Sequence, residues 1–140
     1  MVLYYMDGSH IMMEPMKSKK EAEMIRVHDI LIQRLKKTGL APTKQILDNE
    51  ISKGYEEAIE KQGMKAERIP KDAHWRNAAE KAIQIAKCHL KAILGGCDAS
   101  FPMHLWDRLL PQAEIQINLL QTANANPNVS AHQYLHGTFD

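Results

Sequence analysis

The chain has 140 residues, with 18 basic and 17 acidic side chains and a formal net charge of +1 at pH 7. This length fits one domain with a buried core, and the balanced charge excludes a global positive field that would attract nucleic acid. Any DNA contact must therefore come from a local patch. Two cysteines exclude a disulfide framework, and the apolar start at residues 1–6 is too short for a signal or membrane-spanning segment. We therefore expect a soluble intracellular protein, nuclear or cytoplasmic, that makes no membrane contact.

The first fifteen residues predict a pair of strands. Aromatic and apolar side chains crowd residues 2–6 and 11–15, and Gly8 supplies a turn over residues 7–10. Asp7 lies in this predicted turn, and we interpret it as a turn residue.

A helix is expected next. Ser18 and Glu21 have the spacing of a capping box, which predicts a helix from there to about residue 37, closed by Gly39. Apolar residues of this helix recur at helical spacing and should face the core: Ala22, Ile25, Leu31, Ile32 and Leu35.

Strands and helices alternate in the middle of the chain. Residues 44–50 are expected to form a short buried strand that ends in Asp48, followed by an amphipathic helix over residues 51–62 that Gly63 closes. Residues 64–69 alternate charged and apolar side chains, which is typical of an edge strand.

The longest helical pattern follows a loop at residues 71–76 and ends at the glycine pair 95–96. The last third of the chain should be helical over residues 101–122, with a kink or a break at Pro111, and should close with a short helix over residues 129–136. The long helix has an expected buried stripe of small and aliphatic residues: Ala79, Ala82, Ile83, Ala86, Leu90 and Ile93.

Two acidic residues are the candidates for chemistry. Asp48 ends a strand, where open α/β sheets place their sites, and Glu80 lies early in the long helix. Taken alone, Glu80 would be interpreted as a solvated side chain. A pair of acids, however, can hold a divalent metal that binds phosphate oxygens and activates water or a hydroxyl. We therefore expect Asp48 and Glu80 to lie close enough to share one divalent ion.

Four segments resemble the integrase catalytic core of Ty1/copia- or gypsy-type retrotransposons, and they occur in that family's order: Leu47–Glu50, Arg76–Glu80, Phe101–Gln112 and Leu135–Asp140. The Leu-Trp-Asp-Arg-Leu-Leu-Pro-Gln run in the third segment is the specific one. The resemblance covers nearly the whole chain and implies one domain over residues 1–140, an RNase H-like α/β fold in which helices flank a mixed sheet. It also implies DNA end processing and strand transfer with Mg²⁺ or Mn²⁺, with DNA as the partner of a homo-oligomer.

The resemblance also assigns roles to individual residues. Asp48 and Glu80 match the second and third acids of the family's Asp-Asp-Glu (DDE) triad, so they are the expected catalytic residues and metal ligands. Asn77 would be a supporting polar residue on the turn before Glu80. The expected DNA-binding residues are Lys71, Trp75, Arg76, Asn77, Lys87 and Lys91.

The expected DNA contacts have simpler alternatives. The loop at residues 71–76 offers cations and one aromatic ring, the ingredients of single-strand binding, but Trp75 would equally fit packing on its own domain. Lys87 and Lys91 share a helix face with Glu80, which suits a phosphate backbone beside a metal and suits an ordinary solvated face as well.

A zinc site is a further possibility that the sequence does not favour. The candidate ligands are Cys88, His89, Cys97 and His104, and their spacing fits no strong zinc pattern. Cys88 and His89 are also adjacent, so they point to different faces of the predicted helix. We therefore expect no zinc site there.

The family's first catalytic aspartate has no counterpart in this sequence. In RNase H-like sheets it lies on a central strand, between the strand that contains Tyr4 and the strand that ends in Asp48. Without that strand we expect a chain that does not cut or join DNA. Its sheet would then have to close directly, take a strand from a second copy, or leave residues 1–15 partly disordered, and we expect rearrangement or pairing between two copies. The alternative function is a non-catalytic relic that binds nucleic acid or a protein partner through the same surface.

Overall fold

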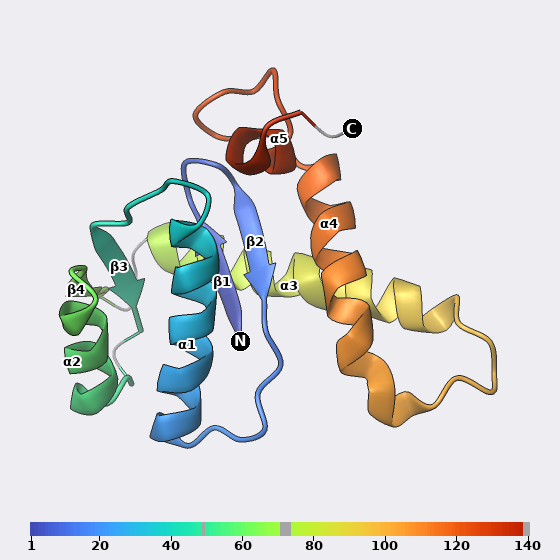
Figure 1. The fold of residues 1–140 in the computed structure, drawn as a ribbon, viewed down its shortest axis with the longest axis horizontal. Coiled ribbons are helices and arrows are strands. Elements are labelled where there is room, and N and C mark those ends of the chain that lie inside the picture. The colour runs from blue at the N-terminus through green and yellow to red at the C-terminus, as the bar shows by residue number, and fades with distance from the viewer. Residues whose placement is uncertain (49, 71–73, 139–140) are drawn as a thin grey trace. The chain divides into compact units, whose positions relative to one another are not determined.

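The computed structural model describes residues 1–48, 50–70 and 74–138, apart from the side chains of residues 74–77. It divides into two compact units: the first comprises residues 1 and 16–80, and the second comprises residues 2–15 and 81–140. Figure 1 shows its elements, which are β1 (Val2–Tyr5), β2 (His10–Met13), α1 (Glu21–Lys36), β3 (Lys44–Leu47), α2 (Lys53–Lys61), β4 (Lys65–Arg68), α3 (His74–Gly95), the 3₁₀ helix η1 (Met103–Leu109), α4 (Leu110–Leu120) and α5 (Ala131–His136).

The second unit begins with a hairpin. β1 and β2 pair antiparallel, from Val2 opposite Met13 to Tyr5 opposite His10. The turn between them is closed by a hydrogen bond of 3.1 Å from the Ser9 N–H to the Met6 carbonyl. Gly8 is needed here for space, because a Cβ at this position would come within 3.0 Å of the rings of Tyr5 and Tyr134. The predicted strands and turn are therefore confirmed. Their bounds differ slightly, because β1 ends at Tyr5 and β2 runs from His10 to Met13, whereas residues 2–6 and 11–15 were expected.

The core of the second unit joins this hairpin to two helices. Its buried members come from β2, α3 and α4: Ile11, Met13, Ala82, Ala86, Leu110, Ala113 and Ile117. Ile85, Leu90 and Ile93 of α3 pack against them. The predicted stripe of α3 was wrong at Ala79 and Ile83, which are exposed. The apolar face of α3 is centred on Ala82 and Ala86. Ile83 and Ile85 flank that line on opposite sides, and of the two it is Ile85 that packs against the core.

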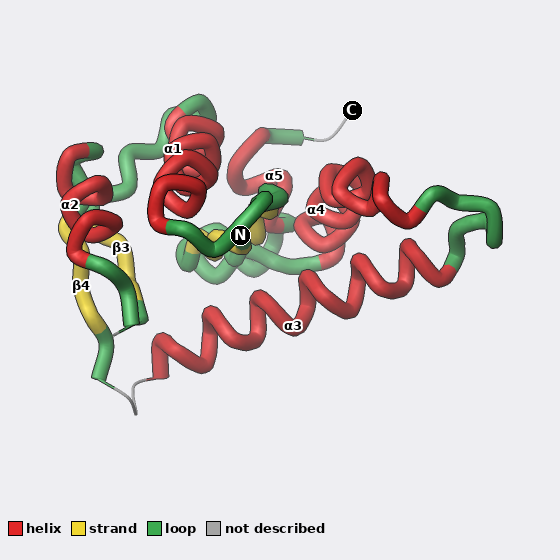
Figure 2. The backbone as a smooth tube through the Cα atoms, turned by 90° about the horizontal axis from the view of Figure 1, so that it is seen from below, coloured by secondary structure: helices red, strands yellow, loops and turns green. Residues whose placement is uncertain are grey.

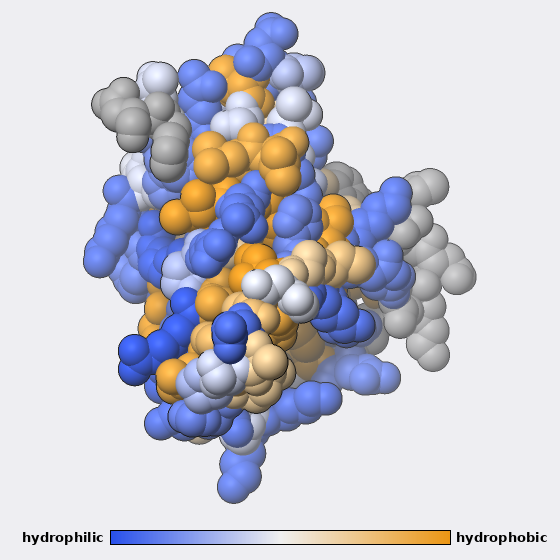
Figure 3. Space-filling model, turned by 90° about the vertical axis from the view of Figure 1, so that its right-hand side faces the viewer, coloured by the Kyte–Doolittle hydropathy of each residue, from blue (hydrophilic) through white to orange (hydrophobic). Residues whose placement is uncertain are grey.

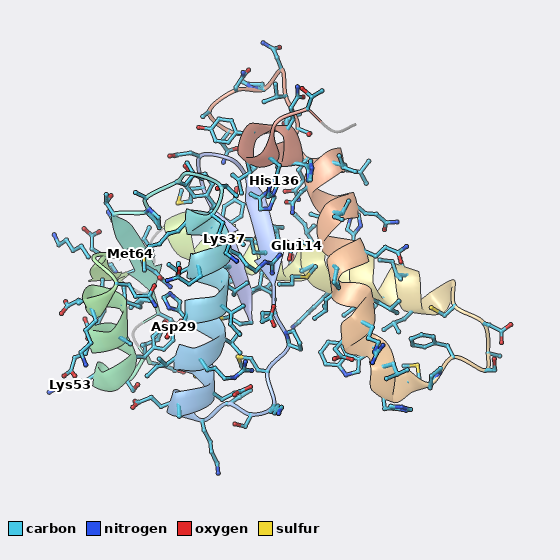
Figure 4. All side chains as sticks on the ribbon, viewed as in Figure 1. Asp29, Lys37, Lys53, Met64, Glu114 and His136 are labelled. Carbon is cyan, nitrogen blue, oxygen red and sulfur yellow. The ribbon has the colours of Figure 1, made fainter. Side chains whose placement is uncertain are left out.

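Helix α4 covers the outer edge of β2 with two polar side chains. The Asn118 side chain accepts a hydrogen bond of 2.9 Å from the Ile11 N–H and donates one of 2.7 Å to the Ile11 carbonyl. The Glu114 carboxylate accepts one of 2.8 Å from the Met13 N–H, and Figure 4 shows Glu114 extending from α4 toward β2. Both side chains are buried. The outward backbone groups of β2 are thus satisfied without another strand.

The break predicted at Pro111 is present. Residues 103–109 form a 3₁₀ helix, and the α-helix starts at Leu110 with Pro111 in its first turn, where a missing N–H removes no helical bond. The apolar side chains of η1 and α4 are only partly buried: Leu110 and Ile117 face the core, while Trp106, Ile115, Leu119 and Leu120 are exposed. Figure 3 shows a face on which hydrophobic residues lie at the surface among hydrophilic ones.

The first unit contains a parallel pair of strands. β3 and β4 run from Lys44 opposite Lys65 to Leu47 opposite Arg68, and the Ile69 N–H donates to the Leu47 carbonyl at 3.2 Å. Helices α1 and α2 belong to the same unit. Its buried apolar side chains come from α1, from β3, from α2 and from the residue before β4: Val27, Leu31, Ile32, Leu35, Leu47, Tyr55, Ile59 and Met64.

The start of α1 differs from the prediction. The helix begins at Glu21 with Lys20 as its N-cap and has no side-chain cap, so the predicted capping box does not form. Ser18 accepts a hydrogen bond of 3.4 Å from the Lys20 N–H instead. Ala22 is exposed because the buried stripe of α1 starts a turn later, at Val27. The predicted ends at Gly39 and Gly63 are confirmed, since both glycines have φ above +80°.

The fold class is the expected one, an α/β arrangement with small sheets and flanking helices. Figure 2 shows its short strands and the single long helix α3. Among the described residues, β1 pairs only with β2 and β3 pairs only with β4. The antiparallel pair and the parallel pair of the predicted mixed pattern are therefore both present.

Candidate functional site

Asp48 lies at the end of a strand, as predicted. β3 ends at Leu47, and the next residue is the exposed Asp48. Its carbonyl accepts a hydrogen bond of 3.4 Å from the Ile51 N–H, which starts the turn toward α2. The strand thus presents the carboxylate at the surface, where it can reach a solvated ligand.

Glu80 is presented by a helix. It lies in α3, is exposed, and belongs to the first unit together with Asp48. The two acids therefore come from different elements, and Glu80 is the last residue of the first unit. That their carboxylates approach closely enough to share an ion stays a prediction.

The residues before Glu80 are helical earlier than predicted. α3 begins at His74, so the backbone of Trp75, Arg76 and Asn77 lies in its first turn and not in a loop or on a turn before the helix. No Gly or Pro interrupts residues 74–80, and these residues tolerate a helix, so α3 includes them. The side chains of these three residues lie outside the description, as does all of Lys71.

Lys87 and Lys91 lie on α3 one turn apart and are exposed, as is Gln84. The predicted polar face of the helix is therefore confirmed as a solvent-facing surface. Whether that surface contacts phosphate groups stays a prediction.

Other candidate ligands do not form a cluster. Within the ranges that the structure describes, no three His, Cys, Asp or Glu side chains group so as to hold a metal ion. Asp7 is a turn residue, as predicted: it is exposed, and its carboxylate accepts a hydrogen bond of 3.4 Å from the Tyr5 hydroxyl. No helix in the described part of the chain is long and apolar enough to span a membrane.

A buried polar cluster supports the strand that carries Asp48. His28 of α1 is almost fully buried, and its Nε2 donates a hydrogen bond of 2.6 Å to the Gln45 side-chain oxygen in β3. The His28 ring also meets the Tyr55 ring of α2 edge-on, at 5.3 Å between centroids. Asp29, labelled in Figure 4, accepts a hydrogen bond from the Gln62 amide just after α2. These contacts tie α1 to both β3 and α2.

Burial sets the protonation of this cluster. Desolvation lowers the pKa of His28 below its usual value, although the Gln45 hydrogen bond and the Asp29 charge act in the opposite sense. Desolvation also raises the pKa of Tyr55 to about 12. Both side chains are therefore neutral at pH 7. The inward position of Tyr55 follows from the helical pattern of residues 51–62, whereas His28 was not expected to be buried, although a histidine on the apolar face of α1 was a usable signal.

Comparisons with known proteins give the fold an independent reference. No family model and no curated protein matches the chain. Its structure is similar to the catalytic core domain of BIV integrase, with a TM-score of 0.71 and 15% identity over 96% of this chain and 82% of that one.

A second neighbour comes from the cryo-EM structure of the simian T-cell lymphotropic virus intasome in complex with the PP2A regulatory subunit B56 gamma. The TM-score is 0.72 and the identity 19%, and the match covers 94% of this chain and 45% of that one. The chain thus spans less than half of that longer protein. The two neighbours show that this 140-residue chain has the RNase H-like fold of an integrase catalytic core.

Proposed function

We propose that this chain is the catalytic-core segment of a retrotransposon integrase, from the class of proteins that process and join DNA with divalent metal ions. The observation that carries this proposal is the position of Asp48, at the end of β3 in an integrase-core fold, with Glu80 on α3 in the same compact unit. The specific Leu-Trp-Asp-Arg-Leu-Leu-Pro-Gln run at residues 105–112 supports the retrotransposon assignment.

The ions that this function requires are Mg²⁺ or Mn²⁺, and Asp48 and Glu80 would hold them. Carboxylate oxygens are hard donors that suit both ions, and both residues are exposed at the surface, where hydrated ions arrive. When bound, such an ion would stabilise charge on a phosphate group. Two carboxylates leave most coordination positions to water, so this chain should bind the ion weakly.

Metal binding tests the ligand assignment directly. Paramagnetic relaxation by Mn²⁺ should locate the ion near residues 48 and 80, and either Asp48→Asn or Glu80→Gln should weaken Mn²⁺ binding at least about tenfold, the effect of losing a charged ligand. Glu57→Gln is the matched control, because Glu57 is an exposed acid of α2 in the same unit. Equal effects of all three substitutions, or none, would contradict the assignment.

The proposed DNA contacts come from α3 and the residues just before it. Lys87 and Lys91 are exposed on that helix and would contact phosphates, together with Arg76. The other proposed DNA-binding residues are Lys71, Asn77 and Trp75, whose ring would stack on a base. Such binding should ignore sequence and weaken with salt, because phosphate contacts carry no base information.

A fluorescence-anisotropy titration at several salt concentrations measures these contacts. Replacing Lys87 and Lys91 by Ala should weaken binding to all sequences alike and reduce the slope of log K against log salt by about 1–2. Replacing Lys53 and Lys61 of α2 by Ala serves as the control, since both are exposed lysines. An unchanged slope in the first variant would show that the α3 lysines are only solvated.

We further propose that the 140 residues by themselves do not cut or join DNA, and act as a nucleic-acid-binding module within a homo-oligomer. Metal-dependent transfer needs ligands on both ions, and the described residues offer no cluster of three. A Mn²⁺-dependent strand-transfer assay decides this. Product that disappears on Asp48→Asn and on Glu80→Gln would contradict the proposal of inactivity and would strengthen the ligand assignment.

A further inference from the structure

Three histidine rings meet where α5 packs on β2 in the second unit. The rings of His132 and His136, both on α5, lie 4.7 Å apart between centroids at an interplanar angle of 36°. The His136 ring also meets the ring of His10 of β2 edge-on, at 5.5 Å. Figure 4 shows His136 between α5 and β2. None of these three residues belongs to the carboxylate site or to the DNA contacts proposed above.

His10 serves the fold and leaves the two rings of α5 as candidate ligands. The His10 ring is buried, its Nδ1 donates to the Ala131 carbonyl at 3.2 Å, and its Nε2 accepts from the Asn118 amide at 3.2 Å. With both nitrogens in hydrogen bonds, this ring offers no lone pair to an ion. His132 is half-buried and His136 is exposed, so solvent reaches both of these side chains.

The backbone of α5 places the two candidate ligands on one face. They are four residues apart in the run His-Gln-Tyr-Leu-His, and residues four apart on a helix lie one above the other. The Ser130 side chain caps the helix by accepting a hydrogen bond of 3.0 Å from the Gln133 N–H. Ala131 and Leu135 are buried and anchor the opposite face. The two rings are therefore held at a fixed spacing before any ion arrives.

This spacing fits two imidazoles on one metal ion. Zn–N bonds are about 2.0–2.1 Å long, which puts each ring centre roughly 3.2 Å from the ion and two ring centres roughly 4.5–5.2 Å apart at bond angles of about 90–110°. The observed 4.7 Å lies within that range. We propose that His132 and His136 bind a divalent ion of the zinc class, which comprises Zn²⁺, Cu²⁺ and Ni²⁺, with water on its remaining positions.

The ligand type decides which ion is taken. Imidazole nitrogen suits zinc, copper and nickel, whereas Mg²⁺ and Mn²⁺ prefer oxygen ligands. Within the part of the chain that the structure describes, no third His, Cys, Asp or Glu completes a metal-binding group. The chain thus supplies two of the four ligands that zinc usually takes, and the ion should exchange readily. The site differs from the carboxylate site in its ligands and in its ion, so this inference goes beyond the proposed function and does not rest on it.

Calorimetric titration with ZnCl₂ tests the pair, on metal-free chain without an affinity tag and in excess Mg²⁺ to occupy oxygen ligands. The wild type should bind one Zn²⁺. Either His132→Gln or His136→Gln should weaken binding at least about tenfold, because even the loss of groups that only support a ligand typically costs about 10–100-fold. His104→Gln is the matched control, since His104 is an exposed histidine of η1, and it should leave the affinity unchanged.

A double variant separates the spacing of the histidines from their number. Gln133→His combined with His136→Gln keeps the number of histidines but puts the two rings on adjacent residues, which a helix turns to different faces, so binding should be as weak as in His136→Gln alone. Both positions are exposed, and protection of the Ile11 amide verifies that the fold is kept. A wild-type chain that binds no Zn²⁺ at about 1 mM, or a double variant that binds as tightly as wild type, would overturn the proposal and leave only a contact between rings.

Discussion

Replacing Asn118 by leucine should destabilise the second unit more than replacing Glu114 by glutamine or Asn128 by leucine. Asn118 is 1% exposed and makes three side-chain hydrogen bonds. Two of them join the N–H and the C=O of Ile11, and the third, of 3.2 Å, is donated to Nε2 of His10, whose Nδ1 donates to the Ala131 carbonyl. Leucine keeps the branched shape and the number of heavy atoms of the side chain, and it removes every one of these bonds.

The cost follows from the groups that would be left behind. Ile11 is 0% exposed, so its N–H and C=O would lose their partners away from water, at about 1–3 kcal/mol for each group. The His10 ring would lose an acceptor bond in addition. The buried leucine would recover part of this through apolar burial, on the order of 1 kcal/mol. A net loss of about 3 kcal/mol is a large share of the roughly 5–15 kcal/mol that stabilises a typical domain.

Urea unfolding followed by circular dichroism measures the loss, and exchange of the Ile11 amide localises it to the edge of β2. Glu114→Gln keeps an oxygen that can accept from the Met13 N–H, so it should cost less than about 1 kcal/mol. Asn128→Leu serves as a control because Asn128 is exposed, and it should change stability by no more than about 0.5 kcal/mol. If the free energy of unfolding of Asn118→Leu lies within about 0.5 kcal/mol of the wild-type value, the role given to Asn118 of α4 in holding β2 is wrong.

Three further outcomes are expected. Because burial lowers the pKa of His28, the unfolded chain binds a proton at this residue at a higher pH than the folded chain does. The stability should therefore fall as the pH drops below about 6.5. In urea titrations between pH 7 and 5, His28→Gln should flatten this slope, and replacing the exposed His104 should not. Gly54→Ala should be neutral or stabilise by up to about 1 kcal/mol in thermal melts, since the new methyl group meets only the movable Glu21 carboxylate; a loss would mean that this carboxylate is fixed. Gly63→Ala should cost about 1 kcal/mol in the same melts, because its φ of +83° strains any side chain; an unchanged melt would contradict that.

The parts of the fold that depend on local chemistry could be predicted from the sequence. Gly39 and Gly63 end their helices because the left-handed backbone there favours glycine, and Pro111 separates η1 from α4 because proline fits only a first turn. Predictions that required a choice of face were less accurate. Ile83 and Ile85 are chemically identical and two residues apart, and only the neighbours of α3 decide which of them is buried.

The candidate site divides in the same way. The positions of Asp48 after a strand and Glu80 on a helix follow from local patterns, and the structure reproduces both. The side chains that hold the strands of the two units were missed, because His28, Glu114 and Asn118 look like ordinary polar interruptions of helical stripes. Their partners lie on distant strands, at Gln45, Met13 and Ile11. Only the tertiary fold reveals that these polar side chains form hydrogen bonds with a strand.

The geometry of α4 and β2 shows how a helix can take the place of a strand. Residues four apart on a helix are separated by about 6 Å along its axis, and residues two apart on a strand by about 6.8 Å. Glu114 and Asn118 therefore match the spacing of Met13 and Ile11, which expose their backbone groups on the same edge. No further strand is needed on that side of the hairpin, because Glu114 and Asn118 supply the hydrogen bonds that a strand would supply.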